Sequence, residues 1–533
     1  MYDILIKNGQ IVDGSGEPAY YGDIAIKDGK ILRIASNINE AASETINADG
    51  MQVTPGFIDN HTHSDESVFY GNDSYNFLEQ GVTTQVAGHC GISPAPITCD
   101  ESRLSDETYR RRVKIARTPT SFIKEAEKQS FGTNMAFFIG HSALREKVLG
   151  YSDAAPNKEQ MKTMQKDLIE AMEAGYLGLS TGLVYAPSVY ANTDELVELT
   201  RVMKPYGGIY ASHIRGEGDN VLRALQEAIS IGTKAGTTVL VSHLKVIGKH
   251  NEGLSGQLLE LIDSANASGA TVYADQYPYT AGSASLASQI PPKYIVGGIS
   301  ALLERLKDQK MRQEILYSIF NKTDEFESCI YSAGFDGTLI VFAGKTPQYV
   351  NKTIGQIAKE EGKEPIDVLA DVLIANDGNM LGVYFNQCVS DLMRIMAHPR
   401  VFMGSDWSDY QNEKVHPETE GKCHPRGTAA TVRRLELVRD FRLRTMEESI
   451  KNLTFDTASA MKLPGLGLIK EGWDANICVI EYDRLHATAD YAHPFRKNHG
   501  VHHVIVNGKL AVRDGCSLGV RAGKVIKRSK NII

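Results

Sequence analysis

Eight short β-rich runs alternate with helix-like stretches through the middle of this 533-residue chain. Between the runs, apolar residues recur at three- and four-residue steps, as in amphipathic helices; TDELVELTRVMKPYG and NVLRALQEAISIGTKAG are examples. Alternation of strands and helices predicts a parallel sheet, and eight repeats are the number that closes a (β/α)8 barrel. The runs are VTPGFIDNHTH, TTQVAGHC, NMAFFIGH, YLGLSTG, GIYASHI, TTVLVSHLK, TVYADQYPY and VFMGSD.

A doubly wound sheet produces similar local patterns, so the alternation alone does not decide between the two folds. Unusual polar residues, however, fall at the C-terminal ends of the runs, which is where barrel enzymes build their active sites. We therefore predict an α/β fold in which residues 56–460 form a TIM-like (β/α)8 barrel.

The two ends of the chain resemble each other. DIAIKDGKILRIA and HHVIVNGKLAVRDG both have the pattern of a hairpin, with Asp-Gly and Asn-Gly at the turns. Because two-stranded hairpins are not stable alone, we expect residues 1–55 and 461–533 to pair into one small β domain with the barrel inserted between them. Residues 287–345 break the alternation and predict an insertion, which is either a lid over the barrel mouth or a plain surface excursion.

The stretch GFIDNHTHSD places His61 and His63 two residues apart after a strand-like run. Alternate side chains of a strand share a face, so both imidazoles are expected to project the same way. Two ligands are too few for a zinc ion, but further candidates follow the second, fifth, sixth and eighth runs. These candidates are Cys90, His213, His243 and Asp406.

Taken alone, each candidate ligand has an ordinary explanation. A histidine at a strand end is commonly a satisfied polar group, and Cys90 could be a small buried side chain. Together the candidates offer four imidazoles, one thiolate and one carboxylate that face a common axis. We therefore predict a site for one or two zinc ions.

Charge and composition exclude several classes of protein. The net charge of −8 and the lack of a basic stripe argue against nucleic-acid binding. The first residues, MYDILIKNGQIVDG, contain no apolar signal-peptide core, and no apolar run is long enough to span a bilayer. Seven scattered cysteines do not suggest a disulfide framework. We expect a soluble cytoplasmic protein, monomeric or oligomeric, that acts on a small molecule and has no nucleic-acid or membrane partner.

The ligand set resembles that of the amidohydrolase superfamily, in which an HxH on strand one joins histidines on strands five and six and an aspartate on strand eight. Many members add a carboxylated lysine on strand four, but YLGLSTGL contains none. GHCGIS instead resembles the N-acyl-D-amino-acid deacylases (D-aminoacylases), in which a strand-two cysteine in a GxCGxS context binds metal. The resemblance covers nearly the whole chain, and STGLVYAPSVYA and DQYPYTAGS are specific to this branch.

The resemblance implies hydrolysis of an N-acyl-D-amino acid to a carboxylate and a free D-amino acid. Zinc lowers the pKa of bound water to about 7, so we expect hydroxide to attack the acyl carbonyl. Asp406 is the predicted general base, which accepts the water proton and returns it to the leaving amine. Zinc held by Cys90, His213 and His243 is expected to polarise the carbonyl, and the resemblance implies that Tyr185 stabilises the oxyanion.

An N-acylated amino acid carries a free carboxylate, which needs a cation. Arg426 in CHPRG matches the deacylase HPRG motif, and its planar fork suits a carboxylate. Lys245, two residues beyond His243, is a second candidate, and a solvated surface charge is the alternative for both. By the same resemblance, Tyr277 and Ser283 in YPYTAGS bind substrate, although core and turn roles explain them nearly as well.

Two stretches depart from the family pattern. WSDYQNEKVHPETEGKC, which follows Asp406, is longer than expected, and TAATVRR stands where deacylases show an aromatic before a Phe-Pro-Arg step. These departures leave open whether Arg426 keeps its family position and which side chains the pocket accepts. His141 in FIGHSALR is interpreted as structural, and His89 is excluded as a ligand because it should point away from Cys90 on a strand.

Three other functions compete with a deacylase. A cyclic-amide hydrolase, such as a hydantoinase or dihydroorotase, usually needs the strand-four lysine that is absent here. A deaminase does not fit the terminal β domain or the STGL segment. A non-catalytic scaffold with the amidohydrolase fold predicts decayed ligands, whereas all six candidates are present.

Overall fold

The computed structural model describes residues 1–98, 100, 104–321, 326–410 and 423–529. Each of the eight predicted runs contains a strand, and the strands pair in parallel in two sheets. The sheet orders are β6-β7-β8 and β17-β13-β12-β11-β10-β9. The bounds are β6 Phe57–Asp59, β7 Val82–Ala87, β8 Asn134–Phe137, β9 Ile139–Gly140, β10 Gly178–Gly182, β11 Ile209–His213, β12 Thr238–Val241, β13 Val272–Gln276 and β17 Val401–Met403.

Backbone contacts lie close to the edges of the two parallel sheets. At one edge β8 leads through Phe138 directly into β9, and Phe138 N–H donates to the carbonyl of Ala87 at 2.8 Å. At the other edge Asn60 N–H donates to the carbonyl of Met403 at 2.9 Å, just beyond β6. The carboxyl ends of strands from both sheets therefore lie close together, as the predicted α/β fold requires.

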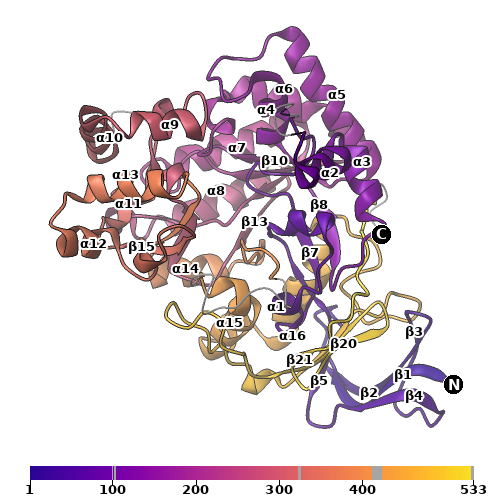
Figure 1. The fold of residues 1–533 in the computed structure, drawn as a ribbon. Coiled ribbons are helices and arrows are strands. Elements are labelled where there is room, and N and C mark those ends of the chain that lie inside the picture. Colours follow the sequence, from indigo (N-terminus) through magenta and orange to yellow (C-terminus); the bar gives the residue numbers. More distant parts are fainter. Residues whose placement is uncertain (99, 101–103, 322–325, 411–422, 530–533) are drawn as a thin grey trace.

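Helices follow most of the parallel strands and pack against them (Figure 1). Both helices singled out from the sequence are present as α6 and α7, and Gly236 caps α7 in a left-handed conformation. The helices between the strands are α1 Tyr75–Leu78, α2 Glu107–Ala116, α3 Pro119–Ala126, α4 His141–Leu149, α5 Lys158–Ala174, α6 Thr193–Arg201, α7 Val221–Ala235, α8 Ser255–Ala267 and α14 Val389–Met396. Beyond β17 come α15 Arg426–Asp440, α16 Met446–Lys451 and α17 Thr457–Ala460.

The terminal segments pair in one nine-stranded sheet of order β21-β20-β19-β18-β5-β1-β2-β3, with β4 beside β1. Both expected hairpins are present, as β2–β3 and β19–β20, and β5 pairs with β18 to join the two ends of the chain. Figure 1 shows these indigo and yellow strands side by side. Their bounds are β1 Tyr2–Ile11, β2 Tyr20–Lys27, β3 Lys30–Ala35, β4 Ala42–Asn47, β5 Gln52–Pro55, β18 Ile477–Ile480, β19 Val501–Val506, β20 Lys509–Arg513 and β21 Cys516–Ser517.

The first predicted run is divided at Gly56. Its first half is β5 of the nine-stranded sheet, and its second half is β6 of a parallel sheet. A side chain at Gly56 would lie 2.2 Å from that of Thr83, so only glycine permits this close approach. Because of this division, the segment that leads to His61 belongs first to the nine-stranded sheet and then to the parallel sheet β6-β7-β8.

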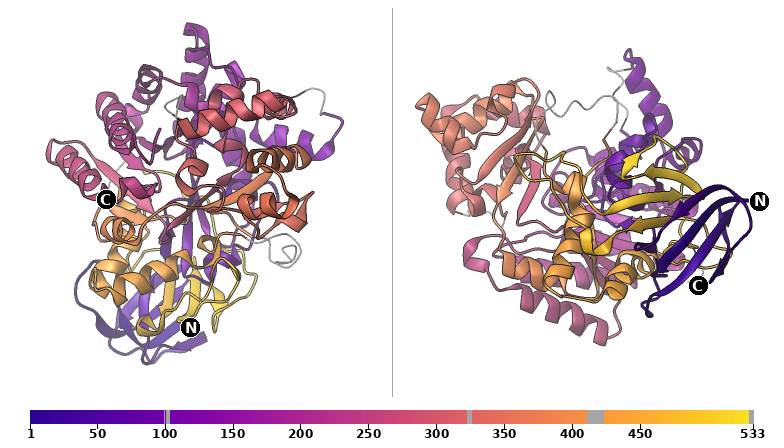
Figure 2. Two further views of the ribbon diagram at one scale, coloured as in Figure 1. Left: turned by 90° about the vertical axis from the view of Figure 1, so that its left-hand side faces the viewer. Right: turned by 90° about the horizontal axis from the view of Figure 1, so that it is seen from below.

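Residues 281–385 carry a sheet and a hydrophobic core of their own. β14, β16 and β15 form an antiparallel sheet, against which five helices pack. These elements extend on both sides of the predicted 287–345 segment, and their helices face the viewer in the left view of Figure 2. Their bounds are β14 Ala281–Ser285, α9 Ile299–Arg305, α10 Gln309–Asn321, α11 Cys329–Ala333, β15 Thr338–Ala343, α12 Ile354–Glu361, α13 Pro365–Ala375 and β16 Met380–Phe385.

Among the described residues, no helix combines the length and the apolar character needed to cross a bilayer. α5 is the longest at 17 residues, and it carries several charged side chains.

Candidate metal centre and active site

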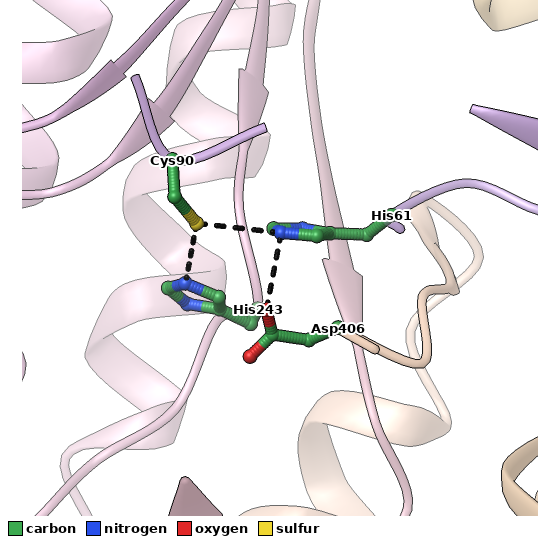
Figure 3. Close-up of side chains that lie close together, drawn as sticks. All are labelled: His61, Cys90, His243 and Asp406. Carbon is green, nitrogen blue, oxygen red and sulfur yellow. Dashed lines mark hydrogen bonds and ion pairs between the residues drawn. The ribbon is translucent and has the colours of Figure 1, made fainter. Parts of the chain in front are cut away.

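Four side chains from separate strand ends point toward one another (Figure 3). His61, Cys90, His243 and Asp406 follow β6, β7, β12 and β17, and their ligand atoms all lie within 4.8 Å of one another. Cys90 Sγ is 3.4 Å from Nε2 of both His61 and His243. Asp406 Oδ1 is 3.4 Å from His61 Nε2. These four residues are called the metal cluster below.

The metal cluster has the donor atoms and the spacing that zinc requires. The bond lengths of a tetrahedral zinc site separate neighbouring nitrogen, oxygen and sulfur ligands by about 3.3 to 3.6 Å. The three contacts within the metal cluster measure 3.4 Å each. Imidazole, thiolate and carboxylate are also the usual protein ligands of zinc. The residues present therefore fit the metal that the sequence predicts.

The other two predicted ligands border the metal cluster. His63 Nε2 lies 3.0 Å from Asp406 Oδ1. The ring of His213 meets that of His243 edge-on, with centroids 4.3 Å apart, and both imidazoles belong to a second possible metal-binding group with Glu217. All six predicted ligand residues therefore lie together, four in the metal cluster and one on either side of it.

Two buried carboxylates that the sequence reasoning missed hold the histidines in place. Asp275 Oδ1, at the end of β13, lies 3.0 Å from His61 Nδ1 and accepts a 2.7 Å hydrogen bond from the backbone N–H of His243. Glu217 Oε1 lies 3.1 Å from His243 Nδ1 and 3.7 Å from His213 Nε2. A carboxylate on the far nitrogen fixes the tautomer of a metal-binding histidine. The only sequence signal was the presence of these acids in YADQ and HIRGEG.

Burial sets the protonation of the metal cluster. It lowers the pKa of His61 and His213 well below 6.5, so both rings are neutral and can bind metal. Burial and the neighbouring carboxylates raise the pKa of the Cys90 thiol. Burial alone would also raise the pKa of Asp406, but the Arg426 guanidinium and the adjacent histidines hold it well below its usual value.

The backbone of the metal cluster departs from strand geometry. Cys90, His243 and Asp406 have φ angles of 55°, 36° and 54°, in the left-handed region that side-chain-bearing residues rarely adopt. The alternation argument that excluded His89 consequently does not apply, because β7 ends at Ala87. The ring of His89 in fact stacks on that of His61, with centroids 4.0 Å apart.

The two candidate carboxylate-binding cations have different surroundings. Arg426 is buried beside the metal cluster, where Nη1 forms a 2.9 Å ion pair with Asp406 Oδ2 and Nη2 donates to the carbonyl of Ser283 at 3.2 Å. Its Nε has no hydrogen-bond partner among the described residues. Lys245 instead pairs with Glu217, and despite their burial this attraction raises the pKa of Lys245 and lowers that of Glu217. Arg426 therefore retains a free donor, whereas the charge of Lys245 is matched within the protein.

Two cavities meet at the metal cluster. The narrow cavity contains about 590 Å³ of empty space and has mixed walls, to which the polar side chains of Gln289, Asn386 and Gln387 contribute. The wide cavity contains about 1900 Å³ and has mostly apolar walls. Asp406, Tyr185 and Ser283 line both cavities. If a molecule places one of its groups in each cavity, the bond that joins the two groups therefore lies beside these three residues.

The remaining predicted residues lie around this junction. The ring of Tyr185 meets that of His213 with centroids 4.9 Å apart, and burial raises the pKa of its hydroxyl well above 10, so it stays protonated. Tyr277 lies under the guanidinium of Arg426, 4.7 Å from it. The hydroxyl of Ser283 has no hydrogen-bond partner within the described part of the chain. These groups offer hydrogen bonds to a ligand at the junction.

Comparisons with known proteins agree with this geometry. No family model matches the chain. It is 30% identical over 532 residues to the D-aminoacylase of Alcaligenes xylosoxydans xylosoxydans, and the alignment covers 99% of this chain and 98% of that protein. The chain belongs to the N-acyl-D-amino-acid deacylase (D-aminoacylase) family. The N-acyl-D-aspartate deacylase of the same organism is 29% identical over 536 residues, which cover 98% of this chain and 95% of that deacylase.

A solved structure extends the likeness to the fold. The N-acyl-D-glutamate deacylase of Bordetella bronchiseptica, crystallised with zinc and a phosphonate inhibitor that mimics the tetrahedral intermediate, superposes with a TM-score of 0.81. The sequences are 28% identical, and the match covers 99% of each chain. The fold of this deacylase family is thus reproduced along the full length of the described chain.

Of the two stretches that depart from the family pattern, one lies mostly outside the described residues and the other is helical. Residues 411–422, most of the long segment after Asp406, lie outside the described residues. TAATVRR belongs to α15, which Arg426 begins. His141 is buried between Ser188 and Glu195, and its Nε2 lies 3.3 Å from the Glu195 carboxylate, in agreement with the predicted structural role.

Proposed function

We propose that this protein is a zinc-dependent deacylase that hydrolyses the amide bond of N-acyl-D-amino acids to a carboxylate and a free D-amino acid. The observation that carries the proposal is the position of the metal cluster, which lies where a narrow cavity with mixed walls and a wide, mostly apolar cavity meet. Full-length similarity to three deacylases of this type supports the substrate class. A substrate with two groups around one amide bond suits two cavities around one reactive centre.

In this proposal, His61, Cys90, His243 and Asp406 would hold zinc, and His63 and His213 would help to complete a second site. When bound, zinc supplies a Lewis acid that polarises the acyl carbonyl and makes water easier to deprotonate. Asp275 and Glu217 orient the imidazoles through their second ring nitrogens.

Asp406 is the residue that moves the proton. Arg426 and the histidines keep its carboxylate ionised before the reaction, so it can accept a proton from the water that attacks the acyl carbon. The water oxygen forms a bond to that carbon, and the carbon–nitrogen bond then breaks as Asp406 delivers the proton to the amide nitrogen. An acid with a low pKa gives its proton readily to a more basic nitrogen, so the free amine can leave.

Tyr185 and Arg426 are proposed to bind the carbonyl oxygen and the α-carboxylate of the substrate. The protonated hydroxyl of Tyr185 donates to the carbonyl oxygen as negative charge develops on it. Arg426 binds the α-carboxylate through its free Nε–H, while Ser283 and Tyr277 supply further hydrogen bonds. Lys245 contributes mainly through Glu217, since its ammonium group is already paired there.

We also propose that the two parallel sheets close a (β/α)8 barrel at residues 56–460, and that residues 1–55 and 461–533 form a small β domain. The hydrogen bonds at both sheet edges and the nine-stranded terminal sheet support these assignments. The antiparallel sheet and helices around 287–345 are then an insertion that walls the wide cavity. A cytoplasmic location is supported by the six cysteines in the described part of the chain, which form no disulfide.

A panel of substrates tests the proposed function. Zinc-loaded protein is expected to hydrolyse N-acetyl-D-amino acids, to leave the L-enantiomers nearly untouched, and to be inactive on hydantoin and dihydroorotate. The Cys90→Ala variant is the matched control, since it should lose both zinc and activity. Turnover of the cyclic amides with none of the linear ones would replace this proposal with a cyclic-amide hydrolase.

A further inference from the structure

The wide cavity contains an ionisable side chain that the proposed reaction does not use. Glu146 lies on α4 and lines this cavity beside Tyr151. The charged residues next to it in sequence are engaged elsewhere: Arg145 binds Glu195, and Lys147 binds Asp167. Within the described residues, the Glu146 carboxylate itself has no ion pair and no hydrogen bond. A half-buried carboxylate of this kind is costly unless a cation joins it.

The pKa of Glu146 agrees with the lack of a counterion among the described residues. Burial raises the pKa of its carboxyl, and no neighbouring cation offsets the rise. Among the described residues that line the wide cavity, Arg426 is the one lysine or arginine, and it is bound to Asp406 and Ser283. Around Glu146 the cavity thus has a negative charge that no cation of the described residues neutralises.

The rest of the wall suits an aliphatic chain that ends in a cation. Ile295 and Ile299 line the same cavity and offer apolar surface for methylene groups. Tyr151 packs against the beginning of α9, since a Cβ at Gly298 would lie 3.7 Å from its ring. An ammonium or guanidinium group at this place would be attracted by the face of the aromatic ring and, separately, by the negative charge of the carboxylate.

Arg426 sets which half of the substrate enters the wide cavity. It lines the wide cavity and not the narrow one, and the α-carboxylate that it is proposed to bind shares a carbon atom with the amino-acid side chain. The side chain therefore projects into the wide cavity, while the acyl group occupies the narrow one. This orientation puts the side chain of the substrate within the walls formed by Glu146, Tyr151 and the two isoleucines.

We propose that Glu146 is a specificity residue that selects N-acyl-D-amino acids with a long, positively charged side chain, such as N-acyl-D-lysine and N-acyl-D-arginine. This inference rests on the proposed deacylase function and specifies its substrate. It also predicts poor hydrolysis of acidic substrates, because a second carboxylate in the wide cavity would meet Glu146 rather than a cation.

The test compares kcat/KM for N-acetyl-D-lysine, N-acetyl-D-norleucine and N-acetyl-D-glutamate with the zinc-loaded full chain. Norleucine has the lysine stem without the charge, so the lysine-to-norleucine ratio isolates the contribution of the ammonium group. We expect a ratio of about ten in the unmodified protein, as for a partly desolvated ion pair, and a ratio near one in Glu146→Gln. Glu146→Lys should raise the glutamate-to-norleucine ratio instead.

Two controls separate specificity from general damage. Glu159→Gln removes a carboxylate at the exposed start of α5, paired with Lys162, and should leave the lysine-to-norleucine ratio unchanged. Zinc content and the melting temperature of Glu146→Gln should match those of the unmodified protein. Inhibition by the free amino acids measures binding without turnover. Glu146→Gln should weaken inhibition by D-lysine and leave inhibition by D-norleucine unchanged.

The outcomes distinguish this inference from the function on which it rests. Hydrolysis of the norleucine derivative with no preference for lysine, or a preference that Glu146→Gln leaves intact, overturns the specificity role and leaves the deacylase function standing. Failure to hydrolyse any N-acetyl-D-amino acid, in protein that holds zinc, overturns both.

Discussion

The metal cluster and most walls of the wide cavity are built from different parts of the fold. Every member of the metal cluster lies within three residues of the end of a parallel strand. Cys90 and Asp406 of the metal cluster border the wide cavity. Its other walls come from α4 and the start of α15, from the loops after β7, β10 and β17, and from β14, α9 and β16 of the 281–385 region. Strand ends are held by the sheets, whereas loops and added elements can change without moving them.

This difference separates reaction from selectivity. The relatives of this chain are named for different substrates, D-amino acids in general, D-aspartate and D-glutamate, yet they resemble it to nearly the same degree. Overall identity therefore does not indicate the preferred side chain. We expect changes in the metal cluster to remove activity toward every substrate, and changes in the walls to redistribute it among substrates.

The largest effect is expected for Asp406→Asn. The amide side chain cannot accept the water proton, so kcat should fall about 10³-fold for all N-acyl-D-amino acids alike. Steady-state kinetics on at least two substrates, with zinc content measured in parallel, check this prediction. Asp263→Asn, on an exposed aspartate paired with His398, is the matched control and should retain full activity. A substrate-dependent loss in Asp406→Asn would break the proposed division between reaction and selectivity.

A smaller effect, still common to all substrates, is expected for Asp275→Asn. This change removes the carboxylate that orients His61, and zinc affinity should fall about 10- to 100-fold. Competition with a chromogenic chelator measures the affinity directly. An unchanged zinc affinity would limit Asp275 to a role in joining β13 to the backbone of His243.

Arg426→Lys is expected to raise KM about tenfold, because an ammonium group cannot reproduce the planar fork that binds a carboxylate. The effect should appear with every substrate that has an α-carboxylate and disappear with the corresponding amides. Comparison of KM for N-acetyl-D-methionine and its carboxamide tests this point. Equal losses for both compounds would show that Arg426 acts through its ion pair with Asp406 instead.

The smallest effect is expected for Ile299→Ser in the wall of the wide cavity. Loss of its apolar contact should lower kcat/KM about threefold for long side chains, in keeping with about 0.8 kcal/mol per buried methylene group. N-acetyl-D-alanine, which does not reach this wall, should be hydrolysed as before. An equal loss for alanine would mean that the 281–385 region shapes the metal cluster as well as the cavity.

Much of the fold was predictable because its signals are local. Each of the eight runs contains a strand, and both hairpins are present, since alternation and Asn-Gly or Asp-Gly turns depend on neighbouring residues. The full extent of the 281–385 region was not predictable. Its β14 pairs with β16, which lies about a hundred residues later in the sequence, and a local sequence pattern cannot predict a pairing over that separation.

The candidate site was predictable in its residues and less so in its geometry. All six ligand candidates lie together, because parallel strands bring their carboxyl ends to one place. The exclusion of His89 relied on strand alternation, but β7 ends at Ala87 and the backbone at Cys90 is left-handed, so alternation does not extend to these residues. Asp275 and Glu217 were missed because an acid that orients a histidine has no spacing of its own in the sequence.

The central claim is that the metal cluster at the strand ends performs the deacylation. Its most direct test removes metal with a chelator and returns zinc in measured equivalents while hydrolysis of an N-acetyl-D-amino acid is followed. Activity should vanish on removal and return within the first two equivalents. Full activity in protein shown to contain no metal would contradict the account.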